Sequence, residues 1–173
     1  MDETLEKSFV QEMRDALQTQ LSEFELAKKK EEHDAKIVAD EGARRWRELK
    51  DSLKSHVEEI NDGLSESLLS YSENPSGTEF SLKHELNDRT VQITFEPASA
   101  VISYQGKIGK GAFVPRVERD VLEYGWENTT RCDGTKILRK FRLEGDQPPL
   151  AFPTKRMSEI IIRCVVLEPI SED

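Results

Sequence analysis

The first 70 residues contain little of what interrupts a helix. Residues 2–70 have no proline, and their glycines are Gly42 and Gly63. Proline removes a hydrogen bond from a helix interior, and glycine is the next poorest helix former. The stretch therefore predicts one long amphipathic helix, or two helices in tandem.

The chain also has few cysteines, no long apolar run and no excess of basic charge. Its two cysteines, Cys132 and Cys164, are too few for a disulfide framework. They could pair if the fold brings them together, but two buried thiols in a reducing, cytoplasmic setting are the favoured expectation. The longest apolar stretch, residues 160–167, is interrupted by Arg163 and is too short to span a bilayer. The formal net charge of −9 argues against nucleic-acid and membrane partners.

Motifs for chemistry are absent from the sequence. No cluster of His and Cys has the spacing of metal ligands, and no nucleophile elbow or paired-carboxylate motif is present. The glycine-rich segment 106–111 matches neither phosphate-binding pattern and favours a hairpin turn. We therefore expect no catalytic residue, no cofactor and no metal.

What the first 70 residues do contain is two apolar stripes at helical spacing. The first stripe has spacings of 4, 4, 4, 4 and 3 and consists of Leu5, Phe9, Met13, Leu17, Leu21 and Phe24. The charged residues 28–34 interrupt the pattern. The second stripe consists of Ala35, Val38, Gly42, Trp46, Leu49, Leu53, Val57, Ile60, Leu64 and Leu68.

A single helix cannot bury such stripes against itself, so two arrangements remain open. The helix is continuous, or kinked near Gly42, and self-associates; or it folds back as an αα-hairpin. Residues 28–41 lack the Gly, Pro and Asn that turns prefer, which favours the continuous form. The candidate interface residues are Trp46, Leu49, Leu53, Val57, Ile60 and Leu64.

The composition and the apolar pattern of the sequence change after Tyr71. Residues 72–78 contain Asn74-Pro75-Ser76-Gly77 and predict a linker between a helical region, 1–71, and a second domain, 79–173. In that domain alternating apolar residues predict strands at 80–86, 89–96, 100–105, 112–117, 121–127 and 136–143. The predicted class is α+β, with an antiparallel sheet of five or six strands and a packed C-terminal helix.

Two local predictions follow from this reading. A two-residue turn at Asn87-Asp88 would place Leu82 opposite Ile93 and would join the apolar faces of the first two strands. The last element begins near Thr154 as a helix capped by that residue, although the β-branched residues between 160 and 167 leave a strand as the alternative. Pro169 is expected to end it.

The composition favours a non-catalytic, cytoplasmic interaction module of the adaptor or chaperone-like kind, whose helical region contacts another copy or another protein. Residues 1–73 carry a formal charge of −8 of the chain's −9, so the acidity belongs to the helical part. The alternative is a ligand-binding or enzymatic α+β domain. Its pocket between sheet and helix would be lined by His84, Tyr104, Tyr124 and Trp126.

Overall fold

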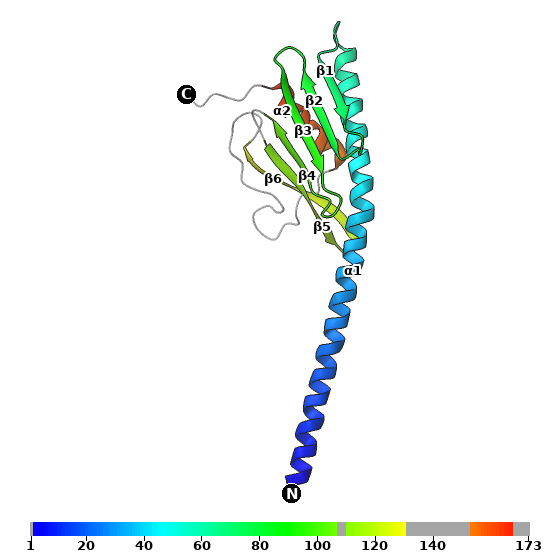
Figure 1. The fold of residues 1–173 in the computed structure, drawn as a ribbon, viewed down its shortest axis with the longest axis vertical. Coiled ribbons are helices and arrows are strands. Elements are labelled where there is room, and N and C mark those ends of the chain that lie inside the picture. Colours follow the sequence, from blue (N-terminus) through cyan, green and yellow to red (C-terminus); the bar gives the residue numbers. More distant parts are fainter. Residues whose placement is uncertain (1, 107–109, 131–152, 168–173) are drawn as a thin grey trace. The chain divides into compact units, whose positions relative to one another are not determined.

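The computed structural model describes residues 2–106, 110–130 and 153–167. Its elements, in chain order, are α1 (Asp2–Asp62), β1 (Leu69–Glu73), β2 (Glu79–His84), β3 (Arg89–Phe95), β4 (Ile102–Gly106), β5 (Lys110–Glu118), β6 (Val121–Thr130) and α2 (Thr154–Val166) (Figure 1). The chain divides into two compact units, Met1–Lys36 and Ile37–Asp173, which we call unit 1 and unit 2. The division falls inside α1 and not at residues 72–78.

Residues 2–62 form one helix, which confirms the continuous form over the hairpin. The helix ends at Asp62, however, and does not run on to residue 70 as expected. The side chain of Asn61 accounts for this ending. Its Oδ1 accepts hydrogen bonds from the backbone N–H groups of Leu68 (3.0 Å) and Leu69 (3.1 Å), and its Nδ2 donates to the Leu69 carbonyl (2.8 Å). Asn61 thus fastens the start of β1 to the end of the helix.

The six strands of the described residues form one antiparallel sheet in the order β1-β2-β3-β4-β5-β6. Each strand pairs with the next one along the chain, as short connections favour. Strand β1 was not predicted, because its residues were assigned to the helix end and the linker. The predicted linker therefore contains the last residues of β1 and the turn into β2. The strand predicted at 136–143 lies outside the described residues.

The β2–β3 hairpin differs from its predicted register by two residues. Leu82 pairs with Val91 and His84 pairs with Arg89, so the connection spans four residues, 85–88, instead of two. Asp88 adopts a positive φ of 60° in this turn. A shift of two residues preserves which side chains face the core, because side chains alternate with a period of two. The predicted apolar face is therefore confirmed although the partner residues are not.

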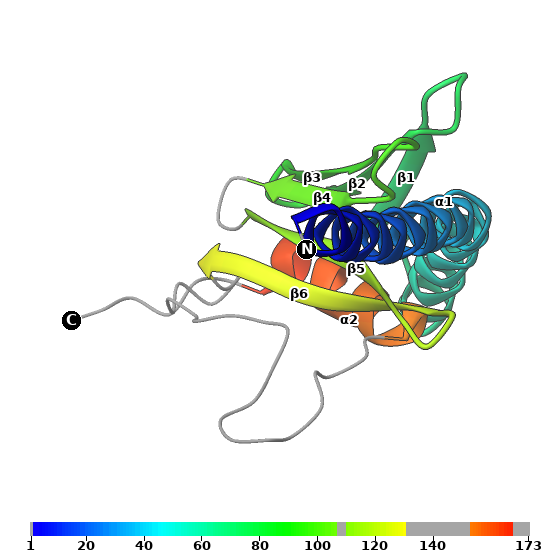
Figure 2. The same cartoon turned by 90° about the horizontal axis from the view of Figure 1, so that it is seen from below.

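Unit 2 has one core, formed between the sheet and two helical segments. Residues 37–62 of α1 and all of α2 lie on the same face of the sheet, and the views in Figures 1 and 2 show the sheet curving from β1–β3 round to β5 and β6. His56 on α1 hydrogen bonds through Nδ1 to the buried hydroxyl of Ser158 on α2 at 2.7 Å. The helical prediction for residues 154–166 is confirmed, although Pro153 and not Thr154 occupies the N-cap. Pro169 lies outside the described residues.

Gly42 lies where α1 approaches the rest of unit 2 closely. A Cβ placed at this glycine would lie 2.4 Å from the Cβ of Ala100. Ala100 precedes β4 and has a positive φ of 59°, and its carbonyl accepts a hydrogen bond of 2.8 Å from the buried Tyr124 hydroxyl. The glycine therefore provides the space that lets the helix rest on this loop.

Candidate functional site

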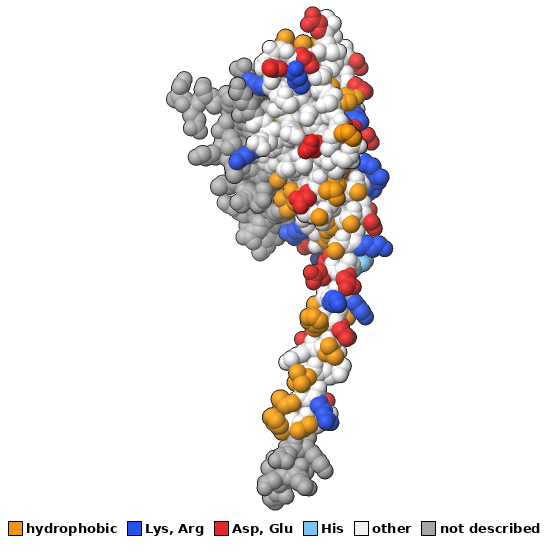
Figure 3. Space-filling model, viewed as in Figure 1, with side chains coloured by type: hydrophobic (Ala, Val, Ile, Leu, Met, Phe, Trp, Pro, Cys, Tyr) orange, Lys and Arg blue, Asp and Glu red, His pale blue; other side chains and the backbone are white. Residues whose placement is uncertain are grey.

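The exposed part of the first stripe is the feature of unit 1 that packing does not explain. Within a single chain the exposed fraction of its side chains is 62% for Phe9, 40% for Met13, 64% for Leu17, 49% for Leu21 and 67% for Phe24. Figure 3 shows hydrophobic side chains along this part of α1. Val10 and Leu26 are also more than two-fifths exposed. Contiguous exposed apolar surface of this kind is uncommon on monomeric soluble proteins.

Four of the candidate interface residues have a different place. Trp46, Leu49, Leu53 and Val57 are no more than 4% exposed, and the strands of unit 2 cover them. Ile60 and Leu64, near the end of α1, remain 39% and 46% exposed. The chain's own sheet thus covers the central part of the second stripe, which removes these four residues from the surface that a partner could reach.

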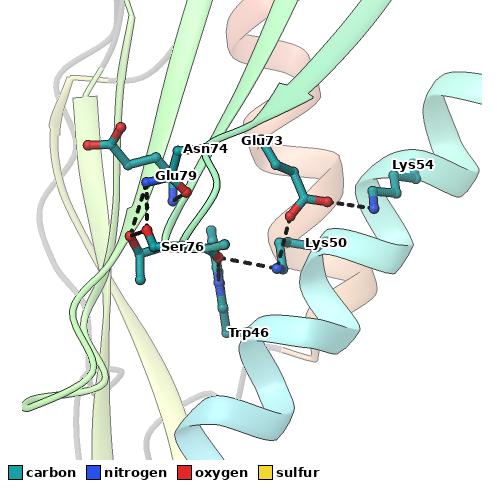
Figure 4. A network of polar contacts seen from close by, with 9 residues as sticks. Trp46, Lys50, Lys54, Glu73, Asn74, Ser76 and Glu79 are labelled. Atoms are coloured by element: carbon teal, nitrogen blue, oxygen red, sulfur yellow. Dashed lines mark hydrogen bonds and ion pairs between the residues drawn. The ribbon is translucent and has the colours of Figure 1, made fainter.

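A polar cluster fastens this covered part of α1 to the β1–β2 turn (Figure 4). The indole N–H of Trp46 donates to the Gly77 carbonyl at 2.7 Å, and its ring stacks on Phe95 with 5.4 Å between ring centroids. Lys50 donates to the same carbonyl at 3.2 Å. Gly77 has a φ of 74°, and the turn is held by Asn74, whose Oδ1 accepts from the Glu79 N–H at 3.0 Å.

Glu73 at the end of β1 completes the cluster. Its carboxylate bonds to the Lys54 ammonium at 2.6 Å and to the Lys50 ammonium at 3.1 Å. The hydrogen bond from Lys54, followed by that from Lys50, holds the pKa of Glu73 below its ordinary value, and the same contact raises the pKa of Lys54. Sequence reasoning missed this cluster because it treated residues 72–78 as a linker. The spacing of Trp46, Lys50 and Lys54, one helical turn apart, was the available signal.

Three of the four candidate pocket residues are close to the core and hydrogen bonded. Tyr104 is fully buried, and its hydroxyl accepts from the Trp126 indole N–H at 2.9 Å. Tyr124 is fully buried and donates to Ala100, and this burial raises the pKa of its hydroxyl. The structure therefore brings Tyr104 and Trp126 into direct contact. The ligand-binding alternative that rests on these residues stays a prediction.

The fourth candidate, His84, ends β2 and takes a local structural role. Its Nδ1 accepts a hydrogen bond of 3.2 Å from the backbone N–H of Leu86, inside the β2–β3 turn. The strand order separates β2 from β4 and β6, which carry the aromatic candidates. His84 is therefore a turn residue whose contact supports the longer hairpin connection.

Cys164 is buried on α2 and is disulfide-bonded, so it is not a free thiol. The expectation of a buried free thiol is therefore wrong for this residue, and Cys132 lies outside the described residues. Disulfides persist in oxidising environments, so the disulfide bond of Cys164 does not favour the reducing setting that was expected from the cysteine count. A cytoplasmic location stays a prediction.

Other classes of site find no support in the part of the chain that the structure describes. Among residues 2–106, 110–130 and 153–167, no three His, Cys, Asp or Glu side chains are grouped so that they could hold a metal ion. Within the same ranges no helix is both long enough and apolar enough to cross a bilayer. Comparison with protein-family models, curated proteins and solved structures finds no match to this chain.

Proposed function

We propose that the protein is a non-catalytic oligomerisation module, in which unit 2 is the folded body and the first stripe of α1 is the contact surface for a second copy. The observation that carries the proposal is the exposure of the stripe from Phe9 to Phe24, at 40–67% for each of its five side chains. The stability of most helices in proteins comes from packing of an amphipathic face. A second helix with the same stripe supplies that packing.

The size of the stripe suits a reversible assembly. Complete burial of one such side chain stabilises by about 1.5–3 kcal/mol, so ten half-exposed side chains from two copies contribute on the order of 10 kcal/mol. Association costs about 4–15 kcal/mol in lost translational and rotational freedom. Because these two magnitudes are similar, we expect a weak oligomer whose population changes with protein concentration.

Light scattering of the full chain over a range of concentrations tests the proposal. We expect the mass to rise towards that of a dimer or larger species. The double substitution Leu17→Glu and Leu21→Glu should return the chain to a monomer, because it places charge in the contact. Thr19→Glu with Ser22→Glu is a matched control, since it adds the same charge at two exposed positions on the side of the helix away from the stripe and should leave the assembly intact. A wild-type chain that stays monomeric at every concentration contradicts the proposal.

A further inference from the structure

Exposed apolar side chains gather at one end of unit 2, and neither the core nor the first stripe accounts for them. Among its described residues unit 2 has seven exposed large aliphatic or aromatic side chains, and five of the seven lie at this end. We call these five residues the end surface. Their exposed fractions are 39% for Ile60, 46% for Leu64, 72% for Leu86, 37% for Val166 and 47% for Leu167.

Hydrogen bonds join the three segments that carry the end surface. The Glu85 N–H in the β2–β3 turn donates to the Leu68 carbonyl at 2.9 Å, and the Asn61 side chain holds Leu68 at the end of α1. On the other side of the same turn, Nη1 of Arg89 donates to the Leu167 carbonyl at 2.8 Å. The end of α1, the β2–β3 turn and the end of α2 thus meet at the same end of the sheet (Figure 1).

Acidic side chains accompany the end surface on the side of α1. Residues 55–69, which include Ile60 and Leu64, contain four acidic residues and no Lys or Arg. Figure 3 shows hydrophobic and acidic side chains together at this end of the molecule. All four acidic residues are exposed, and they are Glu58, Glu59, Asp62 and Glu66.

The β2–β3 turn adds two more acidic residues, and three basic residues lie near this end. Glu85 and Asp88 are exposed in the turn, and the Lys83 ammonium lies 3.9 Å from the first carboxylate and 3.2 Å from the second. Arg89 follows the turn, and Arg163 is exposed in the last turn of α2. Six acidic side chains against three basic ones give this end a formal charge of −3.

This combination of apolar and acidic groups indicates the chemistry of a partner. Complementary charge favours a segment that is apolar on one face and basic beside it. None of the five apolar residues lies in a strand, so the partner packs by its side chains, as an amphipathic helix does. Nucleic acids and anionic membranes do not fit, because their phosphates are negative. The end surface of a second copy does not fit either, because two such ends would bring like charges together.

We infer that the end surface of unit 2 binds a basic amphipathic helix of another protein. The inference goes beyond the proposed oligomerisation, because it uses residues of unit 2 alone and does not involve the first stripe. It gives the module two separate contacts, one in unit 1 for a second copy and one in unit 2 for a different partner. Binding at the end surface should therefore persist in a chain that cannot assemble.

Binding of a model helix to the full chain tests the inference. The parent chain has Leu17→Gln and Leu21→Gln, which remove two apolar side chains of the first stripe without adding charge. The probe is a fluorescent synthetic helix of about 14 residues, with leucine on one face and lysine on the other, and its binding is followed by anisotropy. Adding Leu64→Ser and Leu86→Ser should weaken the dissociation constant about tenfold or more, because the apolar anchors are lost.

Charge reversal gives the second readout in the same parent chain. The triple variant E59K/D62K/E66K should lose affinity for the leucine–lysine helix and gain affinity for a helix in which glutamate replaces lysine. The matched control is D40K/E96K/E118K, which changes the net charge equally at three exposed positions of unit 2 outside the end surface. It should bind both helices like the parent chain.

Several outcomes would overturn the inference. The leucine–lysine helix might fail to bind, L64S/L86S might leave its binding unchanged, or the control reversal might weaken it as much as the triple variant does. Light scattering of the wild type with L64S/L86S gives one more outcome: a lower mass of the assembly would show that a second copy occupies the end surface. A wild-type chain that stays monomeric contradicts the oligomerisation alone, because the binding test does not depend on assembly.

Discussion

The two stripes of α1 share one pattern and have opposite surroundings. Leu17 in unit 1 is 64% exposed, whereas Leu53 in unit 2 is completely buried. Both are leucines on the apolar face of the same helix, separated from their neighbours by three or four residues. Periodicity thus identifies the face of a helix that needs a cover, but it does not say whether the cover comes from the same chain.

The difference between the stripes lies in the residues that accompany them. The second stripe includes Gly42, which allows close approach to Ala100, and Trp46, which combines a stacked ring with a hydrogen bond to Gly77. These features fit one particular surface. The exposed first stripe contains Phe, Met and Leu at regular intervals, which suits another helix with the same repeat. Specific local contacts thus accompany internal packing, and regular repetition accompanies the surface proposed for assembly.

The sharpest way to break the comparison is to place the same charge in both stripes. Leu53→Asp removes a buried side chain and leaves an unpaired charge in the core, so it should cost at least about 4 kcal/mol of unfolding free energy. Leu17→Asp should change the unfolding of unit 2 by less than about 0.5 kcal/mol and abolish assembly. Denaturant titration followed by tryptophan fluorescence measures the first effect, because Trp46 and Trp126 both lie in unit 2.

These titrations should be made at a protein concentration where the wild type is monomeric, so that assembly does not add to the measured stability. Light scattering at higher concentration then reports the effect of Leu17→Asp on assembly. If Leu17→Asp destabilised unit 2 as much as Leu53→Asp does, the first stripe would be part of a core and the distinction between the stripes would be lost.

A smaller effect is expected from Gly42→Ala, which tests the close approach of the second stripe. Alanine is favoured over glycine inside a helix by about 1 kcal/mol. The new Cβ would lie 2.4 Å from that of Ala100, however, and overpacking of this kind costs about 1–3 kcal/mol, so we expect net destabilisation in the same denaturant titration. At Gly63 the nearest atom to a new Cβ is the Ile60 carbonyl oxygen at 3.6 Å, so Gly63→Ala should be close to neutral. A stabilised Gly42→Ala variant would show that the helix does not rest on this loop.

The sequence predicts the class of the fold well because strong periodic signals carry it. The long helix, five of the six described strands and the final helix follow from periods of 3.6 and 2.0 and from the positions of Gly and Pro. The errors occur where a tertiary contact overrides a local signal. Leu64 and Leu68 continue the helical period, but Asn61 binds the backbone of Leu68 and Leu69 and directs the chain into β1.

The candidate site was harder to predict, because exposure is a property of the whole fold. Trp46 and Leu49 look no less suited to an interface than Leu17 and Leu21 when only spacing is considered. The structure separates them by placing the sheet over the former. The Lys50–Glu73 contact joins residues 23 positions apart, and Glu73 stands at the end of β1, in a segment that composition describes as a linker. Only the paired strands bring the two residues together.

The smallest expected effect comes from the ion pairs of Glu73 with Lys50 and Lys54, which connect α1 to β1. Their contribution to stability depends on pH. Lys54 and Lys50 hold the pKa of Glu73 below its ordinary value of 4.5, so the folded state favours the ionised carboxylate. Its contribution to stability is therefore present above pH 4.5 and is lost as the pH falls through the lower, folded-state pKa. Because the Glu73 side chain is 27% exposed, we expect Glu73→Gln to cost only about 0.2–1 kcal/mol at pH 7. At pH 3 the difference between variant and wild type should shrink, and an equal difference at both pH values would mean that the ion pairs do not hold α1 to β1.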